Sequence, residues 1–239
     1  MAHISRKELK KDEVRETFAY GAEALLSHKQ FTIWVVAMAI VAASAFYGWR
    51  SHTQRQTIQA SAEFDDAMRD FQARIVTPGE TAQPGELTYV DEKVKYQDAA
   101  KKFGDVVAKY PRTRPGQFAK YYDALSLEKL GKNDDAKKLL RELAAGGDEE
   151  FAAMARMELA GLSDRTGQPD EAVKLYQQLL AKPTVLVPKP VVLLSLAEHY
   201  GAKNPSEAAK YYGQIKSEYP DTPIAQQAEQ ELGLLPGQS

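Results

Sequence analysis

Residues 99–111 read AAKKFGDVVAKYP, and residues 208–220 read AAKYYGQIKSEYP. The two segments share an Ala-Ala-Lys start, a central glycine and a Tyr-Pro end, at a shift of 109 residues (208 − 99). That shift is close to three periods of about 36 residues, and a fixed period of roughly 20–50 residues is typical of repeat architectures. The sequence therefore predicts further copies of one structural unit between the two segments.

Two intermediate copies complete the series: residues 124–140 read ALSLEKLGKNDDAKKLL, and residues 160–176 read AGLSDRTGQPDEAVKLY. Each copy has an alanine followed four residues later by a large apolar residue, which places both on one face of a helix. The alanine lets a neighbouring helix approach closely, and the larger side chain fills the remaining space. We predict that these pairs form the repeat packing: Ala99, Phe103, Ala136, Leu140, Ala172, Tyr176, Ala208 and Tyr212.

Each copy indicates a helix, a tight turn and a second helix. Gly131 and Gly167 stand where the first helix must end and can adopt the positive φ of a helix C-cap. Asn133-Asp134 and Pro169-Asp170 follow as capping and first-turn residues of the second helix. One such pair cannot bury its apolar face alone, so the pairs are expected to stack.

This pattern resembles the tetratricopeptide repeat family. The copies that begin at Ala99 and Ala208 carry it fully, with a small residue, an aromatic four residues later, an aliphatic seven later and a proline twelve later. In the third copy Pro183 comes one residue early, and the second has Gly146-Gly147 instead of a proline. The resemblance implies an all-α fold with a right-handed tetratricopeptide-like α-solenoid of helix pairs. We assign it to residues 58–239, with a Pro- and Gly-rich loop at 77–89, a helix over about 91–109 and a closing helix over about 223–234.

Residues 31–49, FTIWVVAMAIVAASAFYGW, contain no charged residue. At about 1.5 Å per residue this helix would span roughly 28 Å, close to the hydrocarbon thickness of a bilayer. Trp34, Tyr47 and Trp49 lie near its ends, where aromatic rings prefer the membrane interface. We predict an N-terminal transmembrane helix. Ala43-Ser44-Ala45 also fits a signal-peptide cleavage site, but the long charged segment before it and the apolar run after it favour an uncleaved anchor.

The segments that flank the span set its expected orientation. Residues 1–30 contain six Lys and Arg, whereas the first 20 residues after the span contain three. This bias predicts a short cytoplasmic amphipathic segment at 1–30 and a translocated C-terminal part. The apolar stripe from Val14 to Leu25 fits either a surface helix or a helical lead-in to the span. Residues 50–57 are expected to be a juxtamembrane linker.

The composition excludes several classes of chemistry. The 239 residues include 31 Lys and Arg against 33 Asp and Glu, so no basic excess favours nucleic acid as a partner. With no cysteine, disulfides and thiol catalysis are impossible. The four histidines lack metal-ligand spacing, and His199 is read as a satisfied packing or groove residue. No phosphate-binding loop, nucleophile elbow or zinc-protease motif occurs. Asp148-Glu149-Glu150 is interpreted as a helix cap. We expect no enzyme, metal or cofactor; an enzyme with an unrecognised site is the remaining alternative.

Stacked helix pairs curve, and their first helices line the concave side. Projected from the anchor alanines, the side chains expected in a groove for peptides or partners are Phe118, Tyr121, Leu125, Glu128, Met154, Met157, Asp164, Arg165, Leu193, Ala197 and Tyr200. Tyr, Phe and Met on such a face suit extended or helical peptides. The alternative is that several of these residues only pack against neighbouring helices.

The layout of a charged segment, one span and repeats resembles the YfgM-type family of bacterial inner-membrane proteins, ancillary subunits of the Sec translocon. The residues that carry this resemblance are the amphipathic lead-in, the Ala-rich run at 55–62 and the Tyr-Pro-x-Thr-Pro close at 219–223. The resemblance implies a periplasmic repeat domain that meets translocon subunits, exported client chains and periplasmic chaperones. The leading hypothesis is a membrane-tethered chaperone or adaptor, and the alternative is a dedicated scaffold for envelope or outer-membrane assembly or cell division.

Overall fold

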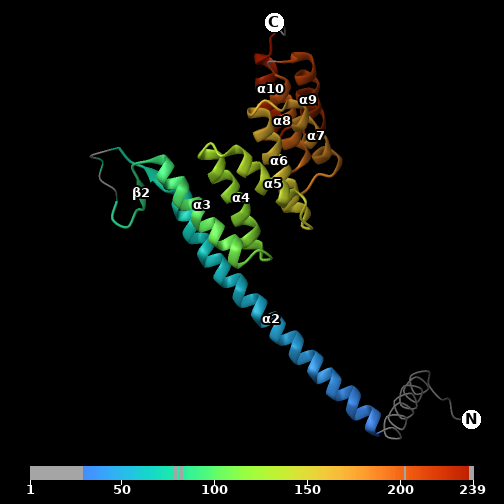
Figure 1. Cartoon of the computed structure of the whole chain (residues 1–239). Helices are drawn as coiled ribbons and strands as arrows, with labels where there is room; N and C mark the ends of the chain where they lie inside the picture. Colours follow the sequence, from blue (N-terminus) through green and yellow to red (C-terminus); the bar gives the residue numbers. More distant parts are fainter. Residues whose placement is uncertain (1–28, 78–79, 81–82, 202, 237–239) are drawn as a thin grey trace, which may run out of the picture. The chain divides into compact units, whose positions relative to one another are not determined.

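The computed structural model describes residues 29–77, 80, 83–201 and 203–236 (Figure 1). The chain divides into two compact units, residues 1–55 and residues 56–239, which we describe separately. The described residues form nine α-helices and one pair of two-residue strands. The predicted all-α fold with tetratricopeptide-like helix pairs is confirmed.

The first unit contains the apolar part of α2 (Lys29–Gln72). This helix is long and apolar enough to cross a membrane. Its large apolar side chains are open to the surroundings: Trp34 is 73% exposed and Met38 69%. Such exposure is unfavourable in water and favourable among lipid tails. Residues 50–57, predicted as a linker, continue the helix because they contain no proline or glycine to end it. The predicted stripe at Val14–Leu25 lies outside the described residues.

The second unit begins with the C-terminal part of α2, which ends at Gln72. Arg74–Ile75 (β1) then pairs in parallel with Thr88–Tyr89 (β2), and the Val76 N–H donates to the Tyr89 carbonyl at 2.8 Å. Within the segment predicted as loop, residues 88–89 are therefore a short strand. Two-residue strands have no periodicity in a sequence, so this pairing could not be anticipated.

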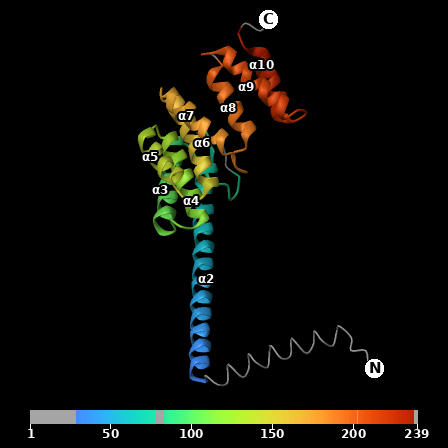
Figure 2. The ribbon, with the colours of Figure 1, turned by 90° about the vertical axis from the view of Figure 1, so that its right-hand side faces the viewer.

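Eight further helices follow. Their bounds are α3 (Glu92–Lys109), α4 (Arg114–Lys129), α5 (Asn133–Ala144), α6 (Glu149–Arg165), α7 (Pro169–Ala181), α8 (Lys189–Tyr200), α9 (Pro205–Glu218) and α10 (Pro223–Leu234). The closing helix α10 has the expected bounds. The α3 helix begins one residue late because Asp91 is its N-cap, accepting from the Lys93 N–H at 2.7 Å. Neighbouring helices α5, α6 and α7 lie side by side within this unit (Figure 2).

The tight turns between paired helices form as predicted at Gly131 and Gly167, whose φ values are +73° and +77°. The capping residues differ from expectation. Lys132 and Gln168 are the N-caps of α5 and α7, and neither makes a side-chain capping bond. Their backbone N–H groups instead bond back to the preceding helix, so the residue after each glycine serves both helices. Asp148 caps α6 as predicted, accepting from the Glu150 N–H at 3.1 Å.

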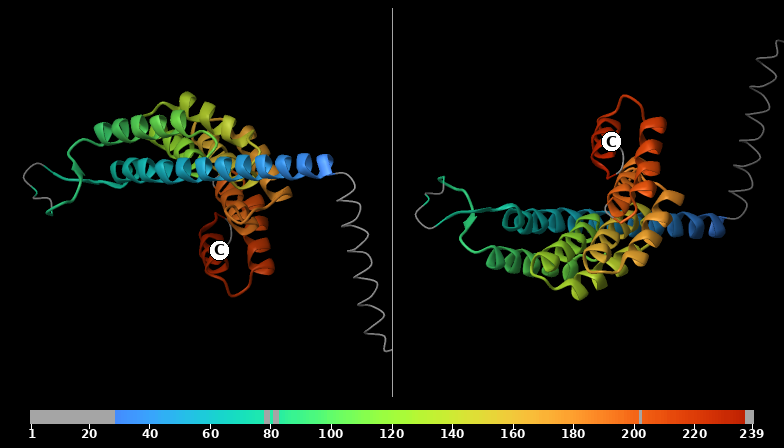
Figure 3. Two further views of the ribbon diagram at one scale, coloured as in Figure 1. Left: turned by 90° about the horizontal axis from the view of Figure 1, so that it is seen from below. Right: turned by 90° about the horizontal axis from the view of Figure 1, so that it is seen from above.

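The core follows the chain as a series of clusters between successive helices. Figure 3 shows the ribbon of these helices from two further directions. All eight residues assigned to repeat packing lie inside it, and none is more than 5% exposed. In the first cluster, Phe103 of α3 meets Phe64 and Phe71 of α2 at ring-centre distances of 5.7 and 6.1 Å. The C-terminal part of α2 therefore acts as the first helix of the first pair.

Candidate functional site

Polar side chains link the first helices of three successive pairs, α4, α6 and α8. Arg165 at the end of α6 reaches Glu128 of α4 at 2.7 Å and Glu158 of its own helix at 3.1 Å. Asp164, next to it, accepts from His199 of α8 at 2.9 Å and from Lys203 at 3.1 Å. We call the surface where these three helices meet the inner face; it comprises Tyr121, Glu128, Met157, Glu158, Asp164, Arg165, Ser195, Glu198, His199 and Tyr200.

The inner face contains a hollow of about 340 Å³. Its lining residues come from α6, α7 and α8: Met157, Glu158, Gly161, Asp164, Arg165, Tyr176, Ser195, Glu198 and His199. Gly161 leaves room for the arginine, since a Cβ at this position would lie 3.0 Å from a guanidinium nitrogen of Arg165. The hollow is thus lined mainly by polar and charged groups, with a smaller apolar surface from Met157, Gly161 and Tyr176.

Three carboxylates of the inner face are partly withdrawn from water, whereas the fourth, Glu198, is exposed: the side chains of Glu128, Glu158 and Asp164 are 19%, 23% and 24% exposed. Burial raises the pKa of Glu158, and the nearby Glu128 carboxylate raises it further against the opposing effect of Arg165. Although Glu198 is exposed, partial desolvation of its carboxyl also raises its pKa, with a smaller contribution from Glu231. A raised pKa means that the charged form lacks full compensation. This part of the face can therefore gain free energy by receiving a cation.

Asp164 behaves differently because it has two cationic partners. Burial alone would raise its pKa, but hydrogen bonds from His199 and Lys203, together with their charges, lower it overall. The His199 side chain is only 4% exposed and its Nδ1 is bound to the carboxylate of Asp164. The interpretation of His199 as a satisfied residue agrees with this geometry.

The predicted groove residues fall into two groups. Nine of them are partly or largely open to solvent: Phe118, Tyr121, Leu125, Glu128, Met154, Met157, Asp164, Arg165 and Tyr200. Leu193 and Ala197 are 0% exposed and pack against Ala208 and Tyr212 of α9, so their assignment to a groove is corrected. The cause is that α9 and α10 cover this side of α8, which the spacing from one anchor alanine cannot reveal.

Packing also accounts for part of the exposed group. The Phe118 ring meets the fully buried Phe151 ring edge-on at 4.7 Å, and Met154 contacts two core clusters. Tyr121 also packs against the first of these clusters, and in addition it points a hydroxyl at Glu158, with an O–O distance of 3.4 Å. We therefore centre the candidate site on Tyr121 and the charged residues beside it.

Four lining residues of the hollow were missed from the sequence: Glu158, Gly161, Ser195 and Glu198. For the two on α8 a signal was present, because Ser195, Glu198 and His199 are polar residues at i, i+3 and i+4 in an otherwise apolar helix. Tyr176 was assigned to packing alone. Its side chain is 5% exposed and also borders the hollow, and burial raises its pKa to about 12.

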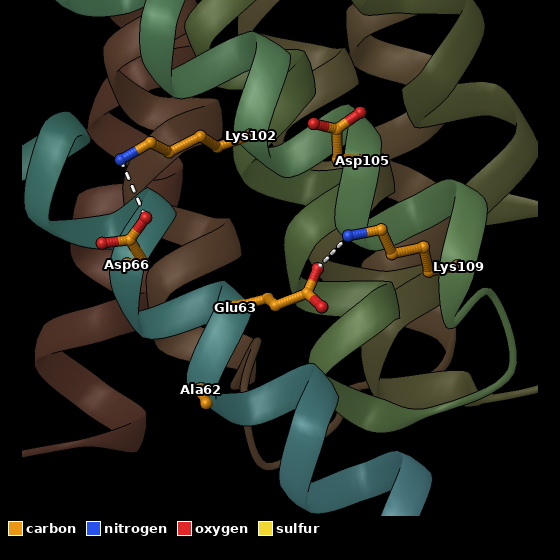
Figure 4. Close-up of a pocket in the computed structure, with 6 residues that line it drawn as sticks. All are labelled: Ala62, Glu63, Asp66, Lys102, Asp105 and Lys109. Atoms are coloured by element: carbon orange, nitrogen blue, oxygen red, sulfur yellow. Dashed lines mark hydrogen bonds and ion pairs between the residues drawn. The ribbon is translucent and has the colours of Figure 1, made fainter.

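A second hollow of about 410 Å³ lies between α2 and α3 (Figure 4). Four of its five charged residues are paired, since Lys102 binds Asp66 and Lys109 binds Glu63, each at 2.8 Å; the fifth, Asp105, has no ion pair among the described residues. Lys102 also reaches the buried Asp70 at 2.8 Å. We interpret these ion pairs as a seam that joins the two helices rather than as a binding site.

The comparisons with known proteins agree with this fold. The family described as "Tetratricopeptide repeat-like domain" matches residues 26–184, and the family described as "Tetratricopeptide repeat" matches residues 192–222. Because the first match covers 159 of the 239 residues (184 − 26 + 1), the chain belongs to the tetratricopeptide repeat-like family. Repeats of this kind are protein–protein interaction modules, and the fold is typically a non-enzymatic scaffold.

Among solved structures, the chain is similar to nearly identical TPR-like repeats attributed to a putative kinesin light chain of Podosopora anserina, and to a single-residue variant of those repeats. Each match has a TM-score of 0.54 and 19% identity, and covers 74% of this chain and 84% of the other. At this identity the likeness establishes the fold alone. No curated protein matches the chain.

Proposed function

We propose that this chain is a membrane-tethered protein-interaction module whose inner face binds segments of partner proteins. The observation that carries the proposal is the hollow of about 340 Å³ where α6, α7 and α8 meet. Beside it, Tyr121, Met157 and Tyr200 are partly exposed and offer aromatic and thioether surface to an apolar side chain. The ion pair between Arg165 and Glu128 and the hydrogen bond between Asp164 and His199 tie α6 to the helices on either side.

The apolar part of α2 supplies the tether. A membrane anchor confines the repeats to a thin layer, which raises their local concentration near membrane-bound partners. The excess of Lys and Arg before the span supports an N-terminus in the cytoplasm and repeats on the periplasmic side of a bacterial inner membrane. Partners would then be envelope proteins rather than cytosolic ones.

Within this location we propose a chaperone or adaptor associated with the Sec translocon, binding translocating or unfolded envelope proteins. The resemblance of the layout to the YfgM-type family supports this role. A dedicated scaffold for envelope assembly is the second candidate. The charges of the hollow favour the scaffold. Glu158, Glu198 and Arg165 restrict binding to partners of one chemistry, whereas an apolar groove would accept many.

In vivo photocrosslinking tests the function. A photoreactive residue is placed at Tyr121 or Tyr200 in the full chain, and a control is placed at Lys174, which is exposed on α7. Adducts from the two inner-face positions, absent from the control, are expected and should be lost in Met157→Ala. Inner-face adducts no more frequent than those at Lys174 would refute the proposal.

The identity of the adducts separates the candidates. Translocon subunits together with many exported chains would support a translocon-associated chaperone. One repeated envelope partner would support a scaffold and refute the chaperone. Adducts with cytosolic proteins alone would refute the proposed orientation.

A further inference from the structure

One arginine on the inner face serves two carboxylates. Arg165 binds both Glu128 and Glu158, at 2.7 and 3.1 Å. The two carboxylate side chains are sheltered, with 19% and 23% of their surface exposed, whereas the arginine side chain is 54% exposed. The arrangement leaves one negative charge without a cation in a partly buried position, and an open arginine covers it.

The other neighbouring basic residues that the structure describes form no ion pair with Glu128 or Glu158. Lys203 and His199 are both bound to Asp164. The Tyr121 hydroxyl donates a hydrogen bond to Glu158. Burial and the Glu158 carboxylate raise the pKa of Tyr121, so the tyrosine remains neutral and supplies no charge. A further carboxylate, Glu198, lines the same hollow with no ion pair among the described residues.

We propose that this region is a seat for a basic side chain, lysine or arginine, carried by the partner segment. The inference rests on the proposed function and names the chemistry of its partner. The incoming cation binds Glu158 and Glu198, and an apolar neighbour in the same segment packs on Met157. A guanidinium fits best, because it can meet a carboxylate with two parallel hydrogen bonds.

Charge complementarity is what selects this occupant. The inner face carries four carboxylates, on Glu128, Glu158, Asp164 and Glu198, against the cations of Arg165 and Lys203. An acidic segment would add to the excess of negative charge. A purely apolar segment would bury carboxylates that lack a full complement of cationic partners, which costs free energy. Only a basic residue relieves both conditions.

Arg165 occupies part of this seat in the free protein. A partner's cation would compete with it for Glu158, and the exposed arginine can turn outward into water. Removing Arg165 should therefore strengthen the binding of a basic segment, whereas an arginine that only stabilised the site would weaken binding when removed. The two roles thus predict opposite signs.

The test is fluorescence anisotropy with the full chain in nanodiscs of neutral lipid, which avoids attraction of basic peptides to the membrane. The probe is a fluorescein-labelled nonapeptide with two arginines among leucine, tyrosine and alanine. Its two twins carry glutamine or glutamate in place of both arginines. We expect the arginine peptide to bind about tenfold more tightly than the glutamine twin, with an affinity that falls as salt rises, and the glutamate twin to bind weakest.

Glu158→Gln should weaken binding of the arginine peptide by about tenfold. Because this change is isosteric and removes an undercompensated charge, it should leave the fold intact, which circular dichroism checks. Arg165→Gln should tighten binding several-fold. The matched control is Glu149→Gln on the same helix, whose exposed side chain pairs with Lys182 and should not affect binding.

Equal binding of the three peptides, abolished by Met157→Ala, would overturn the basic seat while supporting the inner face as a binding surface. Unchanged affinity in Glu158→Gln, or weaker binding in Arg165→Gln, would also overturn the basic seat. If no peptide binds and the photocrosslinks are insensitive to Met157→Ala, both this inference and the proposed function fail.

Discussion

Gly116 lies at the closest backbone approach among the described glycines and offers a sharp test of the structure. It stands in the first turn of α4, where its N–H donates to the Thr113 hydroxyl at 3.1 Å. The same hydroxyl donates to the Tyr110 carbonyl at 2.9 Å, which draws that carbonyl against the helix start. A Cβ at Gly116 would lie 1.9 Å from the Tyr110 oxygen. Gly116→Ala must therefore displace the backbone between α3 and α4.

The last repeat copy indicates which backbone torsion would change in Gly116→Ala. At the shift of 109 residues, Ala225 corresponds to Gly116, and Asp221 corresponds to Arg112. With an alanine in this turn, Asp221 adopts a φ of +60°, the one positive φ among the described non-glycine residues. If Gly116→Ala forces Arg112 into the same conformation, the left-handed backbone costs about 1–2 kcal/mol. Imperfect capping by Thr113 adds up to about 1 kcal/mol.

We therefore expect Gly116→Ala to lower the free energy of unfolding by about 2 kcal/mol, or roughly 4–8 °C in Tm for a unit of this size. Thermal and urea unfolding of the full chain in detergent, followed by circular dichroism, measures it. Adding Arg112→Gly should recover much of the loss, because glycine adopts positive φ freely. The control is Gly213→Ala, in α9 with nothing within 4 Å of its Cβ, which should stabilise by about 0.5–1 kcal/mol. An unchanged Tm for Gly116→Ala, or no recovery with Arg112→Gly, would refute the reasoning.

Two further stability predictions concern buried charges. Burial raises the pKa of Asp123 on α4 to about 6, from a usual value near 3.9 in the unfolded chain. The folded state therefore loses stability as pH rises from about 4 to 6, and Asp123→Asn should stabilise the protein at pH 7.5 by about 1–2 kcal/mol after allowance for partial exposure, with no gain at pH 3.5. Urea unfolding at both pH values checks this, and an equal effect at both would contradict it. Lys137 is 5% exposed and donates to the Thr166 hydroxyl at 2.6 Å. Lys137→Ala should cost about 2 kcal/mol and Lys137→Met less than about 1 kcal/mol, because methionine keeps the buried stem; equal losses in urea unfolding would show that packing contributes little.

The repeat architecture could be predicted because its determinants are local. The alanines at Ala99 and Ala208 recur with the same neighbours, and helix periodicity then places their apolar partners on one face. Gly131 and Gly167 marked both tight turns, since the positive φ of a helix C-cap favours glycine over other residues. The capping carboxylate of Asp148 was equally predictable, because a cap acts only on its own first turn.

The binding face was predicted less completely. Tyr121, Glu128 and Arg165 were all named from the sequence as neighbours of a groove, but nothing in it indicated that one arginine serves two carboxylates. Arg165 lies 37 residues from Glu128 and seven from Glu158, and the three meet only because α4 and α6 pack together.

The sequence by itself determined which residues repeat, where each helix pair turns and which segment is apolar enough to enter a membrane. These properties depend on interactions within one or two helical turns or on composition. Tertiary structure alone decided that Leu193 and Ala197 are covered by α9 and α10, and that Glu158 shares its arginine with Glu128. Periodicity identifies the apolar side of a helix, but exposure and charge compensation depend on which helices pack against that side.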